Sequence, residues 1–202
     1  MLDLRKAFDL VDHSILVEKL RHYGIRGTPL KLIHSFLSDR FQYVCIDGQK
    51  SDFRESKIGV PQGSILSPLL FLLFINDFIN CSSILNFNLF VDDTSLYLRK
   101  NSLSDLFDTL NHELVKIAAW ITSNKLSLNV DKTVYLLFSG RRKIDFCPPV
   151  NLFGKQIERV FQTKFLGVVI DDKISWKPHV QSLCKKMSRM IGILHKLGDF
   201  LT

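Results

Sequence analysis

Two adjacent aspartates are the residues in this sequence most able to do chemistry. Asp92 and Asp93 lie within FVDDTSLY, between short apolar runs that favour β-strands. One interpretation is a hairpin turn, because Asp tolerates turn geometry. A surface turn gains nothing from two like charges, since carboxylates ~4 Å apart near a protein surface repel by about 4 kcal/mol. A bound divalent cation would remove that repulsion.

A third carboxylate, Asp3, stands at the end of a short apolar segment that is typical of a strand end. A strand end and a hairpin tip can share the rim of one sheet, so we expect Asp3 to lie near the pair. Such an oxygen-only site suits Mg²⁺, with Mn²⁺ as an alternative. Two ions of this kind can stabilise the attacking and leaving oxygens of a phosphoryl displacement. The acids are therefore consistent with phosphoryl transfer, although their spacing alone does not require it.

The elements that position these acids follow from hydrophobic periodicity and turn signals. In the first half of the chain we expect a helical pair over 14–38, strands over 41–48 and 53–60 joined around Gly48, and an apolar helix over 67–78. Strands over 89–91 and 94–98 and a long helix over 103–121 follow. The last part should hold short strands over 134–139, 149–153 and 165–170, and a final amphipathic helix from about 178. This order predicts an α+β fold in which an antiparallel sheet, carrying the aspartate hairpin, packs on helices.

Several residues predict where the helices begin. Asp12 or Ser14 can cap the first helix, and Ser102 can cap the long helix. Thr28 and Ser67 each precede a proline, the pattern of a cap followed by proline at the first helical position. The helix that Ser67 opens is apolar on all sides, so we expect it to be buried.

Composition places the chain among globular proteins. It has 202 residues, of which 46% are hydrophobic, and its four cysteines form no C-x-x-C pair. This pattern indicates neither a zinc site nor a disulfide framework, and it favours an intracellular setting. The longest apolar run, at 69–75, is too short to span a membrane, which takes about 20 residues.

The positive charge is concentrated in the last third of the chain. Residues 1–139 hold 15 basic and 15 acidic residues, whereas residues 140–202 hold 12 and 5, which accounts for the whole net charge of +7. The basic end suits a polyanion, although a solvated basic face is the alternative. A basic run followed by two prolines suggests a seam near residue 141, and hence domains at 1–140 and 141–202.

Five segments of the chain resemble, in order, the palm motifs of a reverse transcriptase. They are LDLRKAFDLVDH, GVPQGSILSPLLFLLFINDF, FVDDTSLY, NKLSLNVDKT and FLGVVIDDKISWKPHV. The likeness is to the non-LTR (LINE-type, Jockey-like) retrotransposon polymerases and covers nearly the whole chain. It implies a polymerase palm followed by the start of a helical thumb, and it leads us to expect that fingers preceding Asp3 and most of the thumb are absent.

The resemblance implies a role for each matching catalytic residue. Asp3 and Asp92 match the metal-binding aspartates, and Asp93 matches the second acid beside the primer terminus. Lys132 matches a lysine near the leaving pyrophosphate, where it could act as a general acid or stabilise charge, although a solvated lysine is the alternative.

The same resemblance implies residues that contact the nucleotide and the primer. Phe8 matches the aromatic under the sugar that excludes a 2′-OH, with core packing as its alternative. The turn of Pro61, Gln62 and Gly63 matches the family's nucleotide-binding P-Q-G turn, with an ordinary loop as its alternative. The remaining matches are to primer-binding residues: Phe165, Leu166 and Gly167 to the hairpin that grips the primer, and Lys185 and Arg189 to a thumb helix along its backbone.

The resemblance therefore implies an RNA-directed DNA polymerase that uses Mg²⁺ to add dNTPs to a DNA primer on an RNA template, in the nucleus if it acts as its family does. One alternative is an inactive retrotransposon remnant that at most binds nucleic acid. A metal-dependent phosphodiesterase is a weaker alternative, because Phe8 and the P-Q-G turn would have no role in it. The sequence leaves the oligomeric state open.

Overall fold

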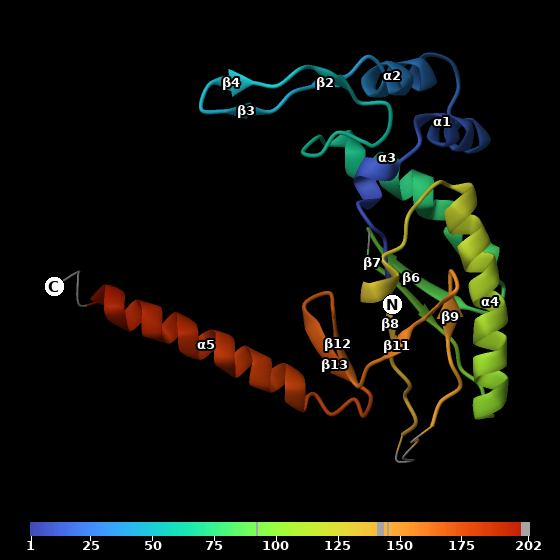
Figure 1. The fold of residues 1–202 in the computed structure, drawn as a ribbon, viewed down its shortest axis with the longest axis vertical. Coiled ribbons are helices and arrows are strands. Elements are labelled where there is room, and N and C mark those ends of the chain that lie inside the picture. Colours follow the sequence, from blue (N-terminus) through green and yellow to red (C-terminus); the bar gives the residue numbers. More distant parts are fainter. Residues whose placement is uncertain (92, 141–143, 145, 199–202) are drawn as a thin grey trace.

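The structure is a computed structural model that describes residues 1–91, 93–140, 144 and 146–198. It combines helices with small, mostly antiparallel sheets, which confirms the α+β class (Figure 1). The α-helices are α1 (His13–His22), α2 (Gly27–Leu37), α3 (Leu66–Ile75), α4 (Leu103–Ser123) and α5 (Lys177–Gly198). In the described ranges, no helix is long and apolar enough to cross a membrane.

A three-stranded sheet lies at the centre of the fold, in the order β1-β7-β6. Its strands are β1 (Leu2–Asp3), β6 (Asn86–Phe90) and β7 (Asp93–Tyr97). Strand β7 is antiparallel to both neighbours, with Leu2 opposite Thr94 and Asp3 opposite Asp93. Opposite residues share a face. Leu2 and Thr94 are buried against the helices, whereas the face of Asp3 and Asp93 is more open.

On the packed face of this sheet, β6 contacts a 3₁₀ helix at Asn76–Cys81, which in turn contacts α4. Phe87 of β6 meets Phe78 edge to face at 5.3 Å, and the Phe78 ring lies 4.5 Å from Trp120 of α4. The core contains four large phenylalanines that are almost fully buried, Phe71, Phe74, Phe78 and Phe107. Burying one such side chain contributes about 1.5–3 kcal/mol, so these rings hold the sheet and helices together.

Two of the expected helix starts are correct and two are wrong. Asp12 caps α1 by accepting a hydrogen bond from the Ile15 backbone at 3.1 Å, and Ser102 caps α4. Helix α2 begins at Gly27 with Arg26 in the cap position, so Thr28 is not its cap. Ser67 lies inside α3, where its hydroxyl donates to the Pro61 carbonyl at 2.5 Å, so it does not cap that helix.

Helix α3 is only partly buried, which corrects the expectation for this apolar segment. Leu70 and Phe74 are within the core, but Leu69 is 53% exposed and the preceding Ile65 is 95% exposed. An all-apolar helix has no polar face to mark its solvent side. The neighbouring elements decide which side is covered, and here they cover one side.

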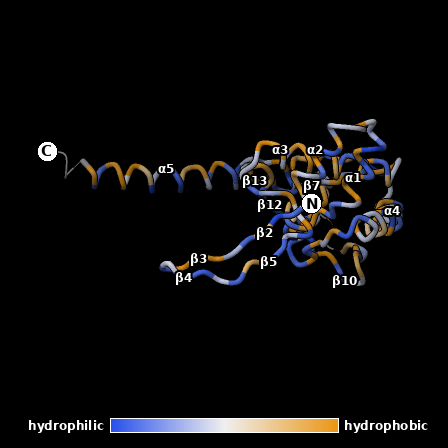
Figure 2. Tube along the Cα trace, turned by 90° about the horizontal axis from the view of Figure 1, so that it is seen from above, coloured by the Kyte–Doolittle hydropathy of each residue, from blue (hydrophilic) through white to orange (hydrophobic). Residues whose placement is uncertain are grey.

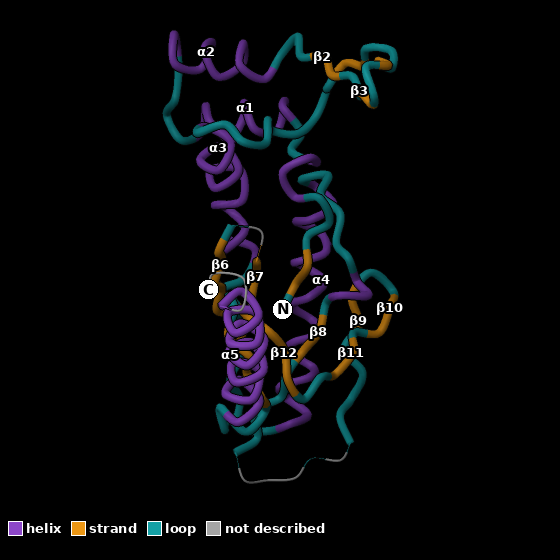
Figure 3. The backbone as a smooth tube through the Cα atoms, turned by 90° about the vertical axis from the view of Figure 1, so that its left-hand side faces the viewer, coloured by secondary structure: helices purple, strands orange, loops and turns teal. Residues whose placement is uncertain are grey.

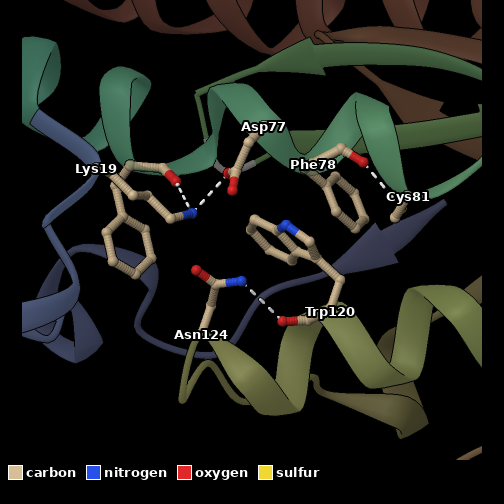
Figure 4. Close-up of polar contacts among 7 residues, drawn as sticks. Lys19, Asp77, Phe78, Cys81, Trp120 and Asn124 are labelled. Atoms are coloured by element: carbon tan, nitrogen blue, oxygen red, sulfur yellow. Dashed lines mark hydrogen bonds and ion pairs between the residues drawn. The ribbon is translucent and has the colours of Figure 1, made fainter. Parts of the chain in front are cut away.

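A largely buried lysine joins the first helix to the core (Figure 4). Lys19 of α1 donates to the Phe74 carbonyl at 2.7 Å and to the Asp77 carboxylate at 2.6 Å. Its Nζ also lies 4.7 Å from the Phe74 ring centroid and 4.8 Å from that of Trp120. Burial lowers the pKa of Lys19, and the ion pair with Asp77 partly offsets that effect. This cation therefore ties α1, α3 and α4 together.

The segment between α2 and α3 forms a projecting ribbon. It consists of β2 (Phe41–Gln42), β3 (Cys45–Ile46), β4 (Gln49–Lys50) and β5 (Arg54–Glu55), with β2 paired to β5 and β3 to β4. The predicted turn around Gly48 is confirmed by its φ of 82°. The ribbon and α5 extend from the same side of the body as two separate arms (Figure 2).

The last third of the chain contains short strands followed by the long helix α5. The strands are β8 (Val134–Tyr135), β9 (Asn151–Leu152), β10 (Lys155–Gln156), β11 (Glu158–Arg159), β12 (Gln162–Phe165) and β13 (Val168–Asp171). Strand β8 pairs in parallel with β11, and β12 forms a hairpin with β13. Figure 1 shows α5 leaving the body beyond this hairpin, and Figure 3 views the same helix nearly end-on. The predicted seam at residues 141–143 lies outside the described residues, so the division into domains stays a prediction.

Candidate active site

Two of the three predicted acids are neighbours across strands. Asp3 of β1 and Asp93 of β7 are register partners. Partners in antiparallel strands have Cα atoms about 4.5–5.5 Å apart and side chains on one face. The two carboxylates can therefore reach a common cation above the open face. Asp92 lies outside the described residues, and in the part of the chain that is described, no cluster of three or more metal-ligating side chains occurs.

The tip of the aspartate hairpin has an unusual backbone. Phe90 pairs with Asp93, so the connection has only two residues, and the first of them, Val91, has a φ of 57°. Two-residue hairpin turns favour positive φ, but a β-branched residue is strained there. Such strain costs roughly 1–3 kcal/mol and persists only where the surroundings enforce it. Asp93 thus lies directly after a tight and strained turn.

The second edge of β1 is held by residues that follow α4. The Asp3 backbone amide donates to the Thr133 hydroxyl at 3.3 Å, and its carbonyl accepts from the Asn129 amide at 2.8 Å. Asn129 directly precedes a 3₁₀ helix at Val130–Lys132. The structure therefore places Lys132 beside the strand of Asp3, with its side chain exposed. A role for Lys132 in pyrophosphate release stays a prediction.

The P-Q-G turn packs on the segment that follows β1. This segment is a 3₁₀ helix at Ala7–Leu10, and the Phe8 carbonyl accepts from the Val60 amide at 2.8 Å. The Gln62 side-chain amide donates to the Asp9 carboxylate at 2.8 Å, while Pro61 is half-buried and Gly63 is exposed. The turn is thus a well-connected part of the site, and its amide donor contacts Asp9 in this structure.

Phe8 packs on the core with one side of its ring. It stacks on Phe71 of α3, with ring centroids 4.7 Å apart and an interplanar angle of 28°. Phe8 is half-buried, whereas Phe71 is fully buried. Phe8 therefore packs on the core with one face of its ring, as the core-packing alternative expects. The proposed exclusion of a 2′-OH by this ring stays a prediction.

Gly59 is the position where the turn approaches the 3₁₀ helix most tightly. Its φ is +85°, and a Cβ there would lie 2.8 Å from the Asp9 carbonyl oxygen. Gly59→Ala should therefore reduce the free energy of unfolding by about 3 kcal/mol, because it adds a clash to the cost of positive φ. Urea unfolding followed by tryptophan fluorescence measures this.

Gly48→Ala is the matched control for the Gly59 variant. Gly48 has nearly the same φ, +82°, but has no atom within 4 Å of the added Cβ. It should lose only about 1 kcal/mol, the cost of the backbone conformation. Equal losses in the two variants would contradict close packing of the P-Q-G turn.

The hairpin predicted from Phe165, Leu166 and Gly167 is confirmed as a hairpin. Phe165 pairs with Val168, and the two residues between them have positive φ of 46° and 86°. This is the two-residue turn that hairpins prefer, with glycine at its second position. Phe165 is half-buried, whereas the turn residues are exposed. A role in gripping a primer stays a prediction.

Helix α5 carries Lys185 and Arg189 away from the acids. Both residues are exposed, and α5 extends from the body beyond the β12–β13 hairpin (Figure 1). The structure therefore does not bring these two cations together with Asp3 and Asp93. The helix is amphipathic as predicted, but its apolar positions are also exposed, including Val180, Leu183, Met187, Leu194 and Leu197.

Sequence reasoning missed three residues that support the site. Asp9 holds Gln62, whereas Asn129 and Thr133 hold the backbone of Asp3. Asp9 was visible within the segment KAFD, but its partner lies 53 positions away. Asn129 acts through its backbone amide and Thr133 through its hydroxyl, both on the backbone of Asp3, and no residue pattern reveals such contacts.

Comparison with known families identifies the class of protein. Residues 1–170 match the family described as reverse transcriptase (RNA-dependent DNA polymerase). The match covers most of the chain, including the paired acids, the P-Q-G turn and the β12–β13 hairpin. The chain belongs to the reverse transcriptase family.

Curated relatives narrow the comparison to mobile elements. The chain is 29% identical over 207 residues to the RNA-directed DNA polymerase from mobile element jockey of Drosophila melanogaster, a match that covers 96% of the chain and 22% of the relative. It is 28% identical over 211 residues to the jockey polymerase of Drosophila funebris, covering 98% of the chain and 23% of the relative. The chain thus spans about a fifth of the length of these relatives.

Proposed function

We propose that the chain is the palm of an RNA-directed DNA polymerase from a non-LTR retrotransposon. The observation that carries this proposal is the register of Asp3 against Asp93 on the open face of the central sheet. Family membership and the jockey-type relatives support the same activity. In this function the palm adds dNTPs to the 3′-OH of a DNA primer paired with an RNA template.

The donor set at the site fits a divalent cation. Asp3 and Asp93 offer hard oxygen ligands on one face, and Asp3 is half-buried while Asp93 is exposed. These two residues, with Asp92 by family resemblance, would hold Mg²⁺ or Mn²⁺. The bound ions would stabilise charge on the oxygens of the transferred phosphoryl group. Asp3 and Asp93 would fix the position of the bound ions relative to the primer.

The surrounding elements suit the substrates of this reaction. The P-Q-G turn and Phe8 form one connected unit next to β1, which fits a nucleotide site. The ribbon and α5 extend from the same side of the body, as a duplex between two arms requires (Figure 2). The basic residues of the last third would contact phosphates of the primer–template. Nuclear action is part of the same proposal, by analogy with the family.

Thermal unfolding in the presence of metal tests the central claim. Millimolar Mg²⁺ or Mn²⁺ should raise the Tm of the chain, because a ligand at 100 times its Kd adds about 2.7 kcal/mol. Asp93→Asn should abolish the rise, since it removes one ligand charge and keeps the side-chain size. Asp47→Asn is the control, because Asp47 is an exposed residue of the ribbon turn. An unchanged Tm of the unaltered chain at saturating metal would contradict the site.

The alternative of an inactive remnant makes a different prediction about nucleic-acid binding. A remnant that only binds nucleic acid needs no cation between its acids. It would bind a primer–template duplex with equal affinity in the presence of Mg²⁺ and of a chelator at matched ionic strength. The retained pairing of the two acids favours the polymerase.

A further inference from the structure

Both polar backbone groups of Gly59, just ahead of the P-Q-G turn, are held by residues around the start of α1. The Gly59 amide donates to the Val11 carbonyl at 2.8 Å, and the Gly59 carbonyl lies 2.7 Å from Nε2 of His13. Asp12 and Ile58 form an antiparallel bridge beside these contacts. The chain that enters α1 therefore pairs with the chain that enters the turn.

The contact between His13 and Gly59 is a side-chain hydrogen bond with a defined direction. A carbonyl oxygen can only accept, so Nε2 of His13 carries a proton and donates it to the bond. Nε2 is protonated in the imidazolium ion and in one tautomer of the neutral ring, so the bond forms in either charge state. His13 is half-buried and reaches Gly59 across 46 positions of the sequence. The side chain is therefore suited to a constant support.

His13 is itself fixed through its neighbour Asp12. The Asp12 carboxylate accepts from the Ile15 amide at 3.1 Å, which caps α1, and from Nζ of Lys125 at 2.7 Å. Lys125 lies just after the end of α4. The Asp12 side chain is largely buried, so this ion pair is partly shielded from solvent. The start of α1, and with it His13, is thus anchored to a second helix.

The peptide group between Gly59 and Val60 is clamped from two sides. His13 holds its carbonyl, and the Phe8 carbonyl accepts from its N–H at 2.8 Å. Glycine has more backbone freedom than any other residue, and Gly59 adopts a φ of +85°. Without the His13 bond, this peptide group would be held by its N–H alone. Its orientation sets the direction in which the chain enters the P-Q-G turn.

We propose that His13 is a positioning residue for the incoming nucleotide, because it clamps the Gly59–Val60 peptide group and so holds the P-Q-G turn against Phe8 and Asp9. The role rests on the proposed function, in which this turn contacts the dNTP. Misplacing a substrate-positioning group by about 1 Å can cost about 10²-fold in rate. His13 does not touch the paired acids, so its loss should weaken nucleotide binding more than the chemical step.

Two amide substitutions of His13 test the clamp directly. Glutamine places its side-chain nitrogen as many bonds from the backbone as Nε2 of histidine, whereas asparagine stops one bond short. Hydrogen exchange at the Gly59 and Val60 amides should be about tenfold faster in His13→Asn than in His13→Gln. Exchange at the Ile15 amide should be equal in the two variants, because Asp12 still caps α1. Equal exchange at Gly59 and Val60 would overturn the clamp.

Primer extension tests the effect on the nucleotide, in a Drosophila melanogaster jockey polymerase whose matching segment is replaced by this chain. His13→Asn should raise the KM for dNTP about tenfold and change kcat less than about twofold, and His13→Gln should restore the KM. A merely structural histidine would lower the Tm of His13→Asn and leave the KM unchanged, which would overturn the proposal. A hybrid that is inactive before any change at His13 would instead contradict the proposed function, and this role with it.

Discussion

Replacing Asp3 by asparagine is expected to reduce primer extension about a thousandfold. The substitution keeps the size of the side chain and its strand pairing with Asp93 but removes a charge that would hold the metal. Losing one preorganised electrostatic contact to the reacting groups typically costs 10²–10³ in rate. The effect should fall on the rate constant of nucleotide addition rather than on primer–template affinity, because α5, which carries Lys185 and Arg189, extends away from the sheet that holds Asp3.

A hybrid polymerase makes this measurement feasible. This chain would replace the matching segment of the jockey polymerase of Drosophila melanogaster, which is 29% identical to it. Single-turnover primer extension with Mg²⁺ would compare the hybrid with its Asp3→Asn and Asp47→Asn forms. Asp47→Asn should retain full activity, since Asp47 lies in the exposed turn of the ribbon. Comparable rates in all three proteins would refute the catalytic role of Asp3.

The second large effect concerns stability. Asp77→Ala should lower the free energy of unfolding by about 2–3 kcal/mol, because it leaves the Lys19 ammonium buried beside a single carbonyl. The side chain of Lys19 is only 14% exposed, whereas that of Asp77 is 36% exposed, so some solvent screening is already included in this figure. Thermal unfolding should show a Tm lower by about 6 °C for a protein of this size.

Lys19→Met separates charge pairing from packing at the same position. Methionine keeps most of the apolar stem against Phe74 and Trp120 and leaves Asp77 partly in water, so its cost should stay below about 1.5 kcal/mol. Glu18→Ala is the control, because its ion pair with Arg21 is exposed and should contribute less than about 0.5 kcal/mol. A larger loss for Lys19→Met than for Asp77→Ala would show that packing, and not the buried charge, dominates.

Local signals in the sequence predicted much of the fold correctly. The Asp12 and Ser102 caps, the long helix α4 and the Gly48 turn depend on neighbouring residues, and all four are present. The pairing of Asp3 with Asp93 was inferable because a strand end and a hairpin tip share the rim of a sheet. Each of these features is determined within a few residues or by one simple rule of sheet geometry.

Features that depend on distant surfaces were not predictable in the same way. Which side of α3 is exposed depends on the elements that pack against the other side. Because the helix is uniformly hydrophobic, its sequence does not indicate which side that is. The hydrogen bond between Gln62 and Asp9 forms only when the P-Q-G turn packs against the 3₁₀ helix in one particular position, and the two residues lie 53 positions apart in the sequence. The projection of α5 likewise depends on how the chain leaves β13. Such arrangements come from tertiary packing and not from local preference.

The support of β1 by distant residues has a consequence for biosynthesis. Asp3 meets Asp93, 90 positions later, and its amide contacts Thr133, 130 positions later. Ribosomes add roughly 5–20 residues per second, so Asp3 must wait many seconds for its supports to emerge. Contacts this far apart also close slowly even in a complete chain. The pairing of the two carboxylates is thus a late step in the folding of a newly synthesised chain. A nascent chain that ends before Thr133 lacks part of the structure that holds Asp3 in place.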